Sequence, residues 1–489
     1  MREELLRMEY VTCGDDNGEQ VENLHFYILK GEVMGLISAT SKGLGTLIGL
    51  VYQNTPIEFG RVWFEGQMVN HYAYGDGSVN KVYIIEERSK LIPNLSVEDN
   101  IFVLRKGFKK YVINRRILRE QVKRLAESMQ VELDTNKRVD ELTPFERCVV
   151  ELLKARLMGA KLVILLYLTN FIGRQDLARF HVLMKHCCQA EMTFLYVENH
   201  HQEVFRVADR AALYSGHRIV KVFEKDEMSD DTMRPYTISF DLPESPRRLL
   251  TDQVCLRFDQ VYGKTIKGLS FSVRQGECLT LFDMDNVLID EVAELIKGGC
   301  RAEKGKIFYE GRLLDDHLGD FLDSGIAVIP EDPTKKAVFK ELTYMENLTF
   351  LLDKKLKGQH VKRAYLRSIR EEYRGLSGDR IDESDMKALE ARELYNLVYL
   401  RIHLFRPRLA VCVRPLAKGD MFCRRQVIQC IQELKNLGIS VLLLTASISD
   451  CLDVSERLLI VRGGRAEAEY DESAFLKLSH SVRGFKQSI

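Results

Sequence analysis

The chain has 489 residues, of which 45% are hydrophobic, enough for two compact domains that each bury a core of their own. Lysine plus arginine equals aspartate plus glutamate at 71 each, and this zero net charge disfavours a general nucleic-acid partner. The 11 cysteines include no Cys-x-x-C pair, which disfavours zinc, and neither a signal peptide nor a membrane-length apolar run is predicted. We therefore expect a cytoplasmic protein with reduced thiols and without a metal site.

The first half begins with strands, a small-residue loop and a helix. Leu24 to Leu29 and Val33 to Ile37 are apolar runs of strand length. Residues 38–45 carry mostly small side chains, and a helix is expected to include Leu47 to Val51. A strand, a glycine-bearing loop and a helix in this order are typical of a phosphate-binding unit, so this loop is the first candidate ligand site.

Farther along the first half, charged and apolar segments alternate. Asn114 to Met129 has the spacing of an amphipathic surface helix. Leu162 to Leu166 and Thr193 to Val197 are predicted to be buried parallel strands. A helix is predicted between them at Leu177 to Cys187, with Asp176 as its N-cap.

The second half follows the same plan. Cys278 to Phe282 is the predicted strand before the loop, and Leu409 to Val413 and Ser440 to Leu444 are the later core strands. Cys423 to Leu437 is the helix expected between those two strands.

The boundary between the halves is predicted from turn-forming residues. We place one domain at residues 1–228, a linker at 229–250 and a second domain at 251–489. Part of the linker, Tyr236 to Phe240, has the composition of an edge strand.

Several stretches recur at a nearly constant offset of about 245 residues, which indicates a duplicated domain rather than a short repeat. The recurring pairs are residues 30–32 and 275–277, 60–66 and 305–311, 95–102 and 342–349, and 208–210 and 455–457.

Two of these stretches carry a resemblance to a known family. Ile326 to Asp332, followed by Leu342 to Asn347, is similar to the "VPEDR…LSVxENI" segment of the tandem ATP-binding subunit of bacterial ribose/galactose-type monosaccharide ATP-binding cassette (ABC) importers. Pro333 stands where that family has arginine, and Leu91 to Ile101 is the first-half counterpart. The resemblance covers nearly the whole chain, in a degenerate form.

The resemblance implies an α/β fold of two tandem ABC-type, P-loop NTPase-like cassettes. Each cassette would have a core parallel sheet, an antiparallel β subdomain and a helical subdomain. It also implies that the two cassettes pair face to face around ATP and Mg²⁺, and that a sugar-importer permease is the partner. The protein would then lie peripherally at the inner face of the membrane.

The first nucleotide loop, residues 38–46, keeps two positions of the GxxxxGK[ST]T pattern, Gly43 and Thr46. Leu44 stands at the position of the phosphate-binding lysine, and Gly45 stands at the position of the Mg²⁺-ligating hydroxyl. We expect at most weak ATP binding, in the first half only and without normal Mg²⁺ coordination. The alternative is a turn that has lost its ligand.

The second loop has lost the pattern altogether. Asp283, Asp285 and Asp290 place negative charge where a polyphosphate would lie, and the glycines are absent. Like charges at short range repel each other strongly in a low-dielectric site, so ATP is not expected here. The alternatives are a solvated acidic turn or, less favoured, a cation site.

The catalytic positions are also lost in both halves. The family's Asp-Glu-Pro-Thr segment aligns with residues 166–169 and 413–416, which puts Tyr167 and Arg414 at the catalytic glutamate. Phe145 and Arg392 stand at glycine positions of the signature loops, and Asn199 stands at the switch histidine. We therefore predict no catalytic residues.

The best-preserved segments lie where the family faces its permease. Pro93, Asn100, Pro330, Glu331 and Asp332 are the candidate docking residues. The alternative is that these segments are kept only for folding.

Three functions remain open. The first is an ABC subunit linked to a sugar importer, which docks on a partner with little or no ATP hydrolysis. The second is a soluble regulatory or scaffold pseudo-ATPase without a transporter. The third, an ordinary active importer ATPase, is disfavoured by the lost motifs.

Overall fold

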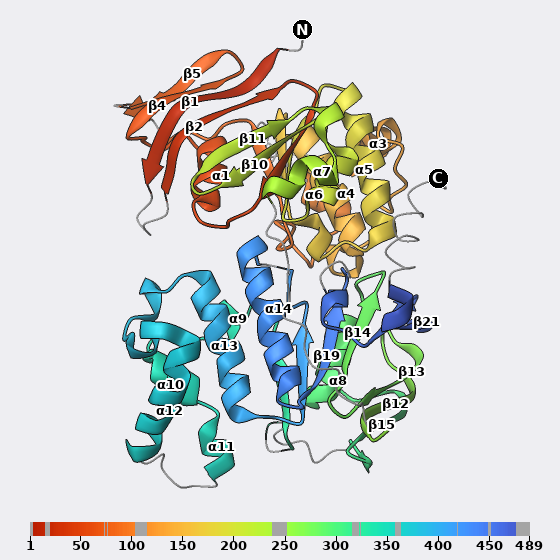
Figure 1. Cartoon of the computed structure of the whole chain (residues 1–489). Coiled ribbons are helices and arrows are strands. Elements are labelled where there is room, and N and C mark those ends of the chain that lie inside the picture. Colours follow the sequence, from red (N-terminus) through yellow and green to blue (C-terminus); the bar gives the residue numbers. More distant parts are fainter. Residues whose placement is uncertain are drawn as a thin grey trace. The chain divides into compact units, whose positions relative to one another are not determined.

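The computed structural model describes residues 3–14, 20–72, 74–75, 77–102, 115–236, 252–314, 322, 324–356, 363–417, 419–447 and 451–475. The chain divides into two compact units, Met1–Ile238 and Ser239–Ile489 (Figure 1). Each unit combines a mostly parallel sheet, an antiparallel sheet and helices. The predicted α/β class and the tandem repetition are confirmed.

Unit one has a six-stranded core sheet in the order β11-β10-β3-β9-β8-β7. Neighbours in it run parallel, except that β11 is antiparallel to β10. The strands are β3 (Val33–Ser38), β7 (Val82–Ile85), β8 (Leu162–Leu166), β9 (Thr193–Glu198), β10 (Arg210–Ser215) and β11 (Arg218–Phe223). Strands β3 and β9 are buried along their whole length, as expected for a sheet covered on both faces.

An antiparallel sheet lies at one end of unit one, and α3, α4 and α5 lie at the other (Figure 1). Its order is β2-β1-β4-β5-β6, with β1 (Glu4–Gly14), β2 (Gln20–Leu29), β4 (Phe59–Phe64), β5 (Gln67–His71) and β6 (Tyr74–Gly75). The helices are α1 (Leu44–Tyr52), α2 (Val97–Phe102), α3 (Arg115–Ser128), α4 (Pro144–Leu157), α5 (Arg174–Gln189), α6 (His201–Val207) and α7 (Asp230–Met233). Short 3₁₀ turns are η1 (Val139–Glu141), η2 (Leu168–Asn170), η3 (Lys225–Glu227) and η4 (Arg234–Tyr236).

Two details differ from the sequence predictions. Helix α5 begins at Arg174 with Gly173 as its N-cap, so Asp176 is not the cap but lies in the first turn, where its charge favours the helix dipole. The predicted linker at 229–250 begins with α7 and η4, and the first unit extends to Ile238. Most of the predicted edge strand at 236–240 lies outside the described residues.

Unit two repeats the core sheet in the equivalent order, β17-β18-β19-β14-β20-β21. The strands are β14 (Cys278–Asp283), β17 (Ile326–Ile329), β18 (Leu409–Val413), β19 (Ser440–Thr445), β20 (Arg457–Arg462) and β21 (Arg465–Asp471). Again the neighbours are parallel, except for the final antiparallel pair. The second antiparallel sheet, β13-β12-β15-β16, contains β12 (Val254–Tyr262), β13 (Lys267–Arg274), β15 (Lys304–Tyr309) and β16 (Arg312–Leu313).

Most helices of unit two, among them α10, α11, α12 and α13, lie away from its antiparallel sheet, whereas α8 lies beside that sheet (Figure 1). The helices of this unit are α8 (Ile289–Lys297), α9 (Pro333–Lys336), α10 (Tyr344–Thr349), α11 (Leu352–Leu356), α12 (Arg363–Ser377), α13 (Ala391–Phe405) and α14 (Met421–Asn436). The 3₁₀ turns are η5 (Gly378–Asp382), η6 (Met386–Ala388) and η7 (Cys451–Asp453). Among the described residues, no helix is long and apolar enough to cross a bilayer.

A buried ion pair recurs in the two units. Arg210 contacts Glu32 at 2.8 Å in unit one, and Arg457 contacts Glu277 at 2.8 Å in unit two. The residue before each arginine also has the same role, because Asp209 accepts the backbone N–H of Val33, just as Glu456 accepts that of Cys278. These contacts join the start of β3 or β14 to β10 or β20, and they explain why both stretches recur in the sequence.

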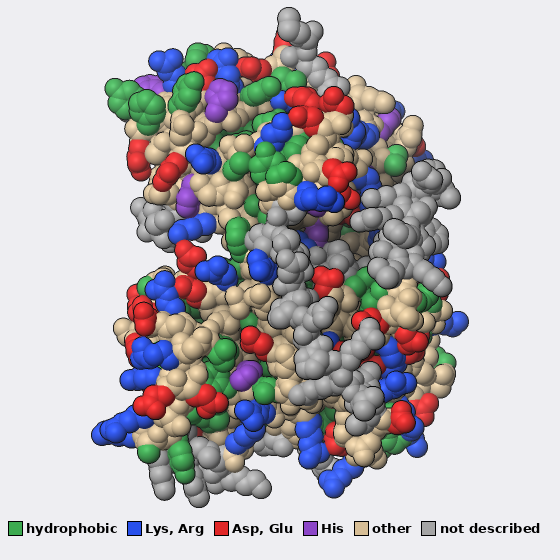
Figure 2. Space-filling model, in the orientation of Figure 1, with side chains coloured by type: hydrophobic (Ala, Val, Ile, Leu, Met, Phe, Trp, Pro, Cys, Tyr) green, Lys and Arg blue, Asp and Glu red, His purple; other side chains and the backbone are tan. Residues whose placement is uncertain are grey.

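The surface carries both signs of charge. On the face shown in Figure 2, Lys/Arg and Asp/Glu side chains are interspersed over both units, in line with the equal totals of 71.

Candidate functional site

The loop between β3 and α1 in unit one is closed by its own surroundings. Gly43 caps α1 with φ 76°, and a Cβ there would lie 2.2 Å from the Gln20 carbonyl oxygen. The hydroxyl of Tyr214 donates to the Lys42 carbonyl oxygen at 2.9 Å. Only glycine fits this left-handed, crowded position, so the matching Gly43 has a structural reason to be present.

The side chains beside this loop are poorly suited to hold phosphate. Leu44, at the lysine position, is 6% exposed and belongs to the apolar core beneath the sheet. The Thr46 hydroxyl is buried and has no hydrogen-bond partner among the residues that the structure describes. What remains for an anion is the backbone N–H groups at the start of α1. ATP binding through Gly43 and Thr46 therefore stays a prediction.

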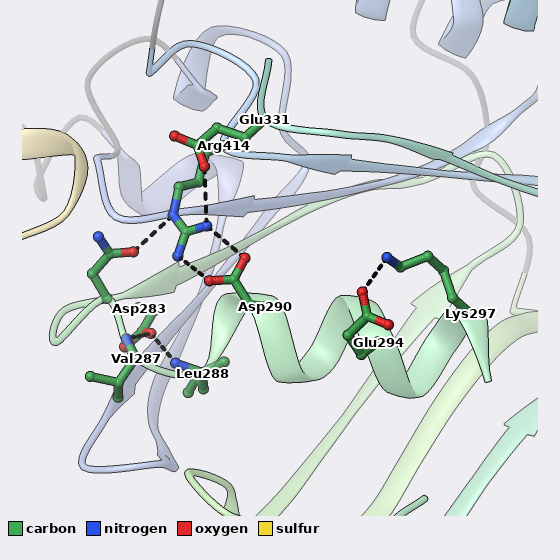
Figure 3. A network of polar contacts seen from close by, with 9 residues as sticks. Asp283, Val287, Leu288, Asp290, Glu294, Lys297, Glu331 and Arg414 are labelled. Carbon is green, nitrogen blue, oxygen red and sulfur yellow. Dashed lines mark hydrogen bonds and ion pairs between the residues drawn. The ribbon is translucent and has the colours of Figure 1, made fainter. Parts of the chain in front are cut away.

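In unit two, the loop between β14 and α8 already contains a carboxylate. Asp283 is fully buried at the end of β14, and its Oδ2 accepts the backbone N–H groups of Val287 at 2.6 Å and Leu288 at 2.8 Å (Figure 3). Its Oδ1 accepts the N–H of Asp285 at 3.1 Å. In a phosphate-binding loop the backbone N–H groups at this place would be available to a bound anion. Here they donate to the Asp283 carboxylate instead.

Arg414 crosses the mouth of the same loop. It forms a two-pronged ion pair with Asp290, with Nη1–Oδ1 at 2.8 Å and Nη2–Oδ2 at 3.0 Å (Figure 3). Its Nε donates to Asn286 at 3.0 Å, and Nη1 lies 3.6 Å from Glu331. Arg414 and Glu331 are each 8% exposed. We call Arg414, Asn286, Asp290 and Glu331 the Arg414 cluster. Arg414 stands at the position of the catalytic glutamate and Asp290 at that of the Mg²⁺-ligating hydroxyl. Asn286 lies in the loop, and Glu331 follows β17.

The acidic residues of this loop are engaged with the chain's own N–H groups and with Arg414. The Asp290 side chain is 74% exposed, and partial desolvation by its neighbours acts to raise its pKa, but hydrogen bonds and charge from Arg414 outweigh this effect and lower the pKa. Burial raises the pKa of Asp283, although the three backbone N–H bonds oppose that shift. A solvated acidic turn is wrong for Asp283, since its side chain has no contact with solvent.

The backbone at the catalytic position is the same in both units although the residues differ. Tyr167 and Arg414 have φ values of 52° and 42°, an uncommon left-handed conformation for non-glycine residues. Each backbone N–H donates to the neighbouring strand, from Tyr167 to Val197 at 3.0 Å and from Arg414 to Leu444 at 2.8 Å. The framework that would aim a catalytic carboxylate is thus kept, with an aromatic side chain in one unit and a guanidinium in the other.

Sequence reasoning missed one buried carboxylate in unit one. Glu198, the last residue of β9, is 1% exposed and accepts the Thr169 N–H at 3.0 Å and hydroxyl at 2.7 Å. Burial, only partly offset by these bonds, raises the pKa of Glu198 to about 7. The sequence signal was a single acidic residue ending an apolar strand. Because its carboxylate is engaged with Thr169 and shielded from solvent, it is not placed to activate a water molecule.

The two former signature stretches have different environments. Phe145 is buried against Phe180, with ring centroids 6.4 Å apart, and Arg179 lies over its ring at 4.5 Å. Arg392 is exposed at the start of α13. The unit-one loop is therefore anchored by an aromatic side chain, whereas the unit-two loop presents a cation.

Asn100, a candidate docking residue, is buried, and its side chain holds the neighbouring loop by hydrogen bonds. It is 0% exposed, and its side chain bonds the backbone of Ile92 in both directions, at 2.6 Å and 2.9 Å. Asn347 does the same for Phe339 in unit two, at 3.0 Å and 2.8 Å. The side chain of Asn100 therefore shapes the loop and cannot contact a partner directly.

The other docking candidates are exposed to different degrees. Pro93 is exposed in the loop that Asn100 holds by hydrogen bonds, and Pro330 is half-buried. Glu331 and Asp332 are each 8% exposed. Glu331 is instead part of the Arg414 cluster, and Asp332 accepts a hydrogen bond from Thr334 at 2.9 Å.

Other polar groups offer no assembled metal site. In the part of the chain that the structure describes, no three His, Cys, Asp or Glu side chains come together as metal ligands. His201, two residues after the switch position Asn199, lies 2.9 Å from the exposed Asp230 carboxylate.

Comparison with known proteins finds ABC transporter ATP-binding proteins among the similar sequences. An ABC transporter family model matches residues 21–165. The ribose import ATP-binding protein RbsA of Clostridium perfringens (strain SM101 / Type A) is 21% identical over 488 residues, which covers 96% of this chain and 95% of that protein. The galactofuranose transporter ATP-binding protein YtfR of Escherichia coli (strain K12) is 23% identical over 487 residues, with 96% and 95% covered.

Among solved structures, RNase-L Inhibitor has a similar fold. Its TM-score is 0.59 at 13% identity, and the match covers 97% of this chain and 93% of that chain. The chain therefore resembles tandem ATP-binding subunits of monosaccharide importers through both halves, and it has the fold of two tandem ABC-type cassettes.

Proposed function

We propose that this chain, two tandem ABC-type cassettes similar to sugar-importer ATP-binding subunits, docks on a permease or another partner and hydrolyses ATP little or not at all. The likeness over 96% of the chain supports the transporter association. The Arg414 cluster is the observation that best supports the proposed lack of hydrolysis, because the chain's own charged groups fill the loop of unit two.

Hydrolysis would require a group that activates the attacking water. In this fold a carboxylate at the end of the strand before the switch strand supplies it, and removing such a group typically costs orders of magnitude in rate. Tyr167 has no basic oxygen at neutral pH, and Arg414 carries a positive charge already engaged with Asp290. Neither residue can take a proton from water.

ATP and Mg²⁺ do not fit unit two. The amides that would face phosphate already bind the Asp283 carboxylate, and Asp290, at the Mg²⁺-ligating position, is paired with Arg414. Unit one offers only helix N–H groups near Gly43, without a lysine or a ligating hydroxyl at the usual positions. Any nucleotide binding is therefore assigned to unit one and is weak.

Docking is supported by exposed aromatic side chains beside one preserved segment. Phe339 and Phe350 are 37% and 45% exposed, and their ring centroids are 4.3 Å apart. Exposed apolar groups held rigidly together are typical of interaction sites. We place the partner there and near Pro93, with the protein in the cytoplasm, peripheral to the membrane.

Turnover is the first test. The purified full chain with Mg²⁺ and ATP should release phosphate at the rate of the buffer blank, with or without added membrane partners. Gly45→Asp is the matched control, because Gly45 is exposed in the first loop and a carboxylate there would repel phosphate. Mg²⁺-dependent turnover by the chain would contradict the proposal, and a fall of that turnover in Gly45→Asp would assign it to unit one.

Partner capture separates the transporter role from a soluble scaffold. Tagged chain recovered from detergent-solubilised membranes of its host should bring a permease subunit with it. Phe339→Ala with Phe350→Ala should weaken that capture, while Tyr365→Ala, which removes an aromatic that is 53% exposed on α12, should not. Recovery of soluble proteins alone would favour the regulatory or scaffold function, which is the alternative.

A further inference from the structure

The helical part of unit two contains a small polar cavity that is separate from the Arg414 cluster. Its volume is about 330 Å³, and it lies among α10, α12, α13 and α14 and the 3₁₀ turn η5. The lining residues that matter are Ser377, Arg380, Arg392, Glu393, Asn396 and Gln426. A volume of this size is near the lower end of ligand pockets, roughly 300 Å³, so the cavity suits a small molecule.

The lining carries an excess of positive charge. Two arginines and one glutamate give a formal charge of +1. Arg380 is engaged with Glu393, with Nε–Oε1 at 2.6 Å, and the other oxygen of Glu393 accepts the Glu390 N–H at 2.8 Å. Arg392 has no ion-pair partner among the described residues and is exposed. The acidic group of the lining is therefore satisfied, and one guanidinium is left to a ligand.

The neutral lining groups are held in fixed orientations. The Gln426 side-chain amide donates to Asn396 at 3.4 Å, and the Asn396 amide donates to the Leu376 carbonyl oxygen at 3.2 Å. The Ser377 hydroxyl donates to the Tyr373 carbonyl oxygen at 2.8 Å. Side chains tied in this way lose little further freedom when a ligand binds, which favours binding.

We propose that this cavity binds a small molecule bearing a carboxylate or phosphate group. The oxyanion would pair with the Arg392 guanidinium and with the N–H groups of Arg380 that do not contact Glu393. A planar guanidinium presents two parallel N–H donors that match the two oxygens of a carboxylate or phosphate. This site goes beyond the proposed function and needs neither ATP nor a permease.

Calorimetric titration of the full chain tests the proposal. Inorganic phosphate and, separately, succinate are titrated at pH 7.5 in nucleotide-free buffer, with ionic strength held constant by chloride. At least one probe should bind saturably. Arg392→Ala should weaken that binding at least tenfold, and so should Gln426→Glu, which keeps the size of the side chain but adds a negative charge.

Arg367→Ala is the matched control, because Arg367 is an exposed arginine on α12 that does not line the cavity. It should bind the probe as the unaltered chain does, and circular dichroism should show all variants folded. Binding of phosphate alone or succinate alone identifies the oxyanion that the cavity prefers. The proposal is overturned if neither probe binds up to about 10 mM, or if binding survives both cavity variants.

Discussion

The two loops that align with the family's nucleotide loop are filled in different ways. In unit one an apolar side chain stands at the lysine position: Leu44 lies in the core, and the Tyr214 hydroxyl donates to the Lys42 carbonyl oxygen. In unit two charged side chains fill the loop: Asp283 accepts its backbone N–H groups, and Arg414 contacts Asp290, Asn286 and Glu331. One fold thus tolerates either an apolar or an ionic replacement of the same site, so the scaffold does not depend on the nucleotide chemistry.

The largest effects should come from the scaffold that the units share. Arg210→Ala and Arg457→Ala each leave a buried glutamate without its partner, and each should destabilise its own unit by about 3–5 kcal/mol. Urea unfolding separates the units, because the single tryptophan, Trp63, lies in unit one whereas far-UV circular dichroism reports on both. Arg210→Ala should move the Trp63 transition, and Arg457→Ala should move only the other. A small effect in one unit alone would show that the two buried ion pairs do not contribute equally to the stability of their units.

The next effect should be confined to unit two. Arg414→Ala leaves Glu331 without its cation, and we expect a loss of about 2–4 kcal/mol. The value lies below that of a fully buried pair because the Asp290 side chain is 74% exposed. Asp290→Asn should cost less than Arg414→Ala, since it removes only the exposed partner. An unchanged circular-dichroism transition in Arg414→Ala would mean that the cluster contributes nothing to the fold.

A pH-dependent effect should be confined to unit one. The pKa of Glu198 is raised to about 7 in the folded chain, above its ordinary value of 4.5, so the folded state holds the proton more tightly. Its contribution to stability is therefore complete below about pH 4.5 and is lost as the pH rises through 7. Glu198→Gln, which mimics the protonated form, should raise the stability of unit one at pH 8 by up to about 3 kcal/mol.

The measurement is the Trp63 unfolding transition at pH 5.5 and pH 8. The gain from Glu198→Gln should be clearly smaller at the lower pH than at the higher one. Unit two has the uncharged Thr445 near the end of the matching strand β19, and its transition should not respond. An equal gain at both pH values would show that the carboxylate does not titrate in this range.

The smallest effects should come from the surface ion pairs of the matching residues Glu65 and Glu310. Lys81 contacts Glu65 at 3.0 Å in unit one, and Arg408 contacts Glu310 at 2.8 Å in unit two, with both cations largely exposed. Lys81→Ala and Arg408→Ala should each change stability by less than about 1 kcal/mol at moderate salt. A loss of several kcal/mol in either variant would show that the exposure of an ion pair does not determine how much it contributes to stability.

Much of the scaffold could be predicted from the sequence because it depends on local patterns. The strands Leu162–Leu166 and Leu409–Val413 were predicted at their observed bounds, since short apolar runs between turn signals specify buried strands. The repeated Asn100 and Asn347 were recognised as matching positions, but their burial was not, because their hydrogen-bond partners are fixed by loop geometry.

The candidate site was less predictable because its contacts join distant parts of the chain. Arg414 lies more than a hundred residues from Asn286 and Asp290 in sequence, so their pairing depends on the sheet that brings β18 beside the loop. Without that contact the acidic residues could only be interpreted as repelling a polyphosphate or as a solvated acidic turn. Glu198 was missed for the same reason, because its raised pKa comes from burial that no sequence pattern revealed.

The most direct test of the account is whether Mg²⁺-ATP stabilises either unit, because a ligand that binds the folded state must raise its unfolding midpoint. The two transitions would be followed by Trp63 fluorescence and circular dichroism across an ATP titration. We predict no shift in the unit-two transition and at most a small shift in unit one. A saturable rise of several degrees in the unit-two midpoint would contradict the claim that the chain's own residues have replaced the nucleotide.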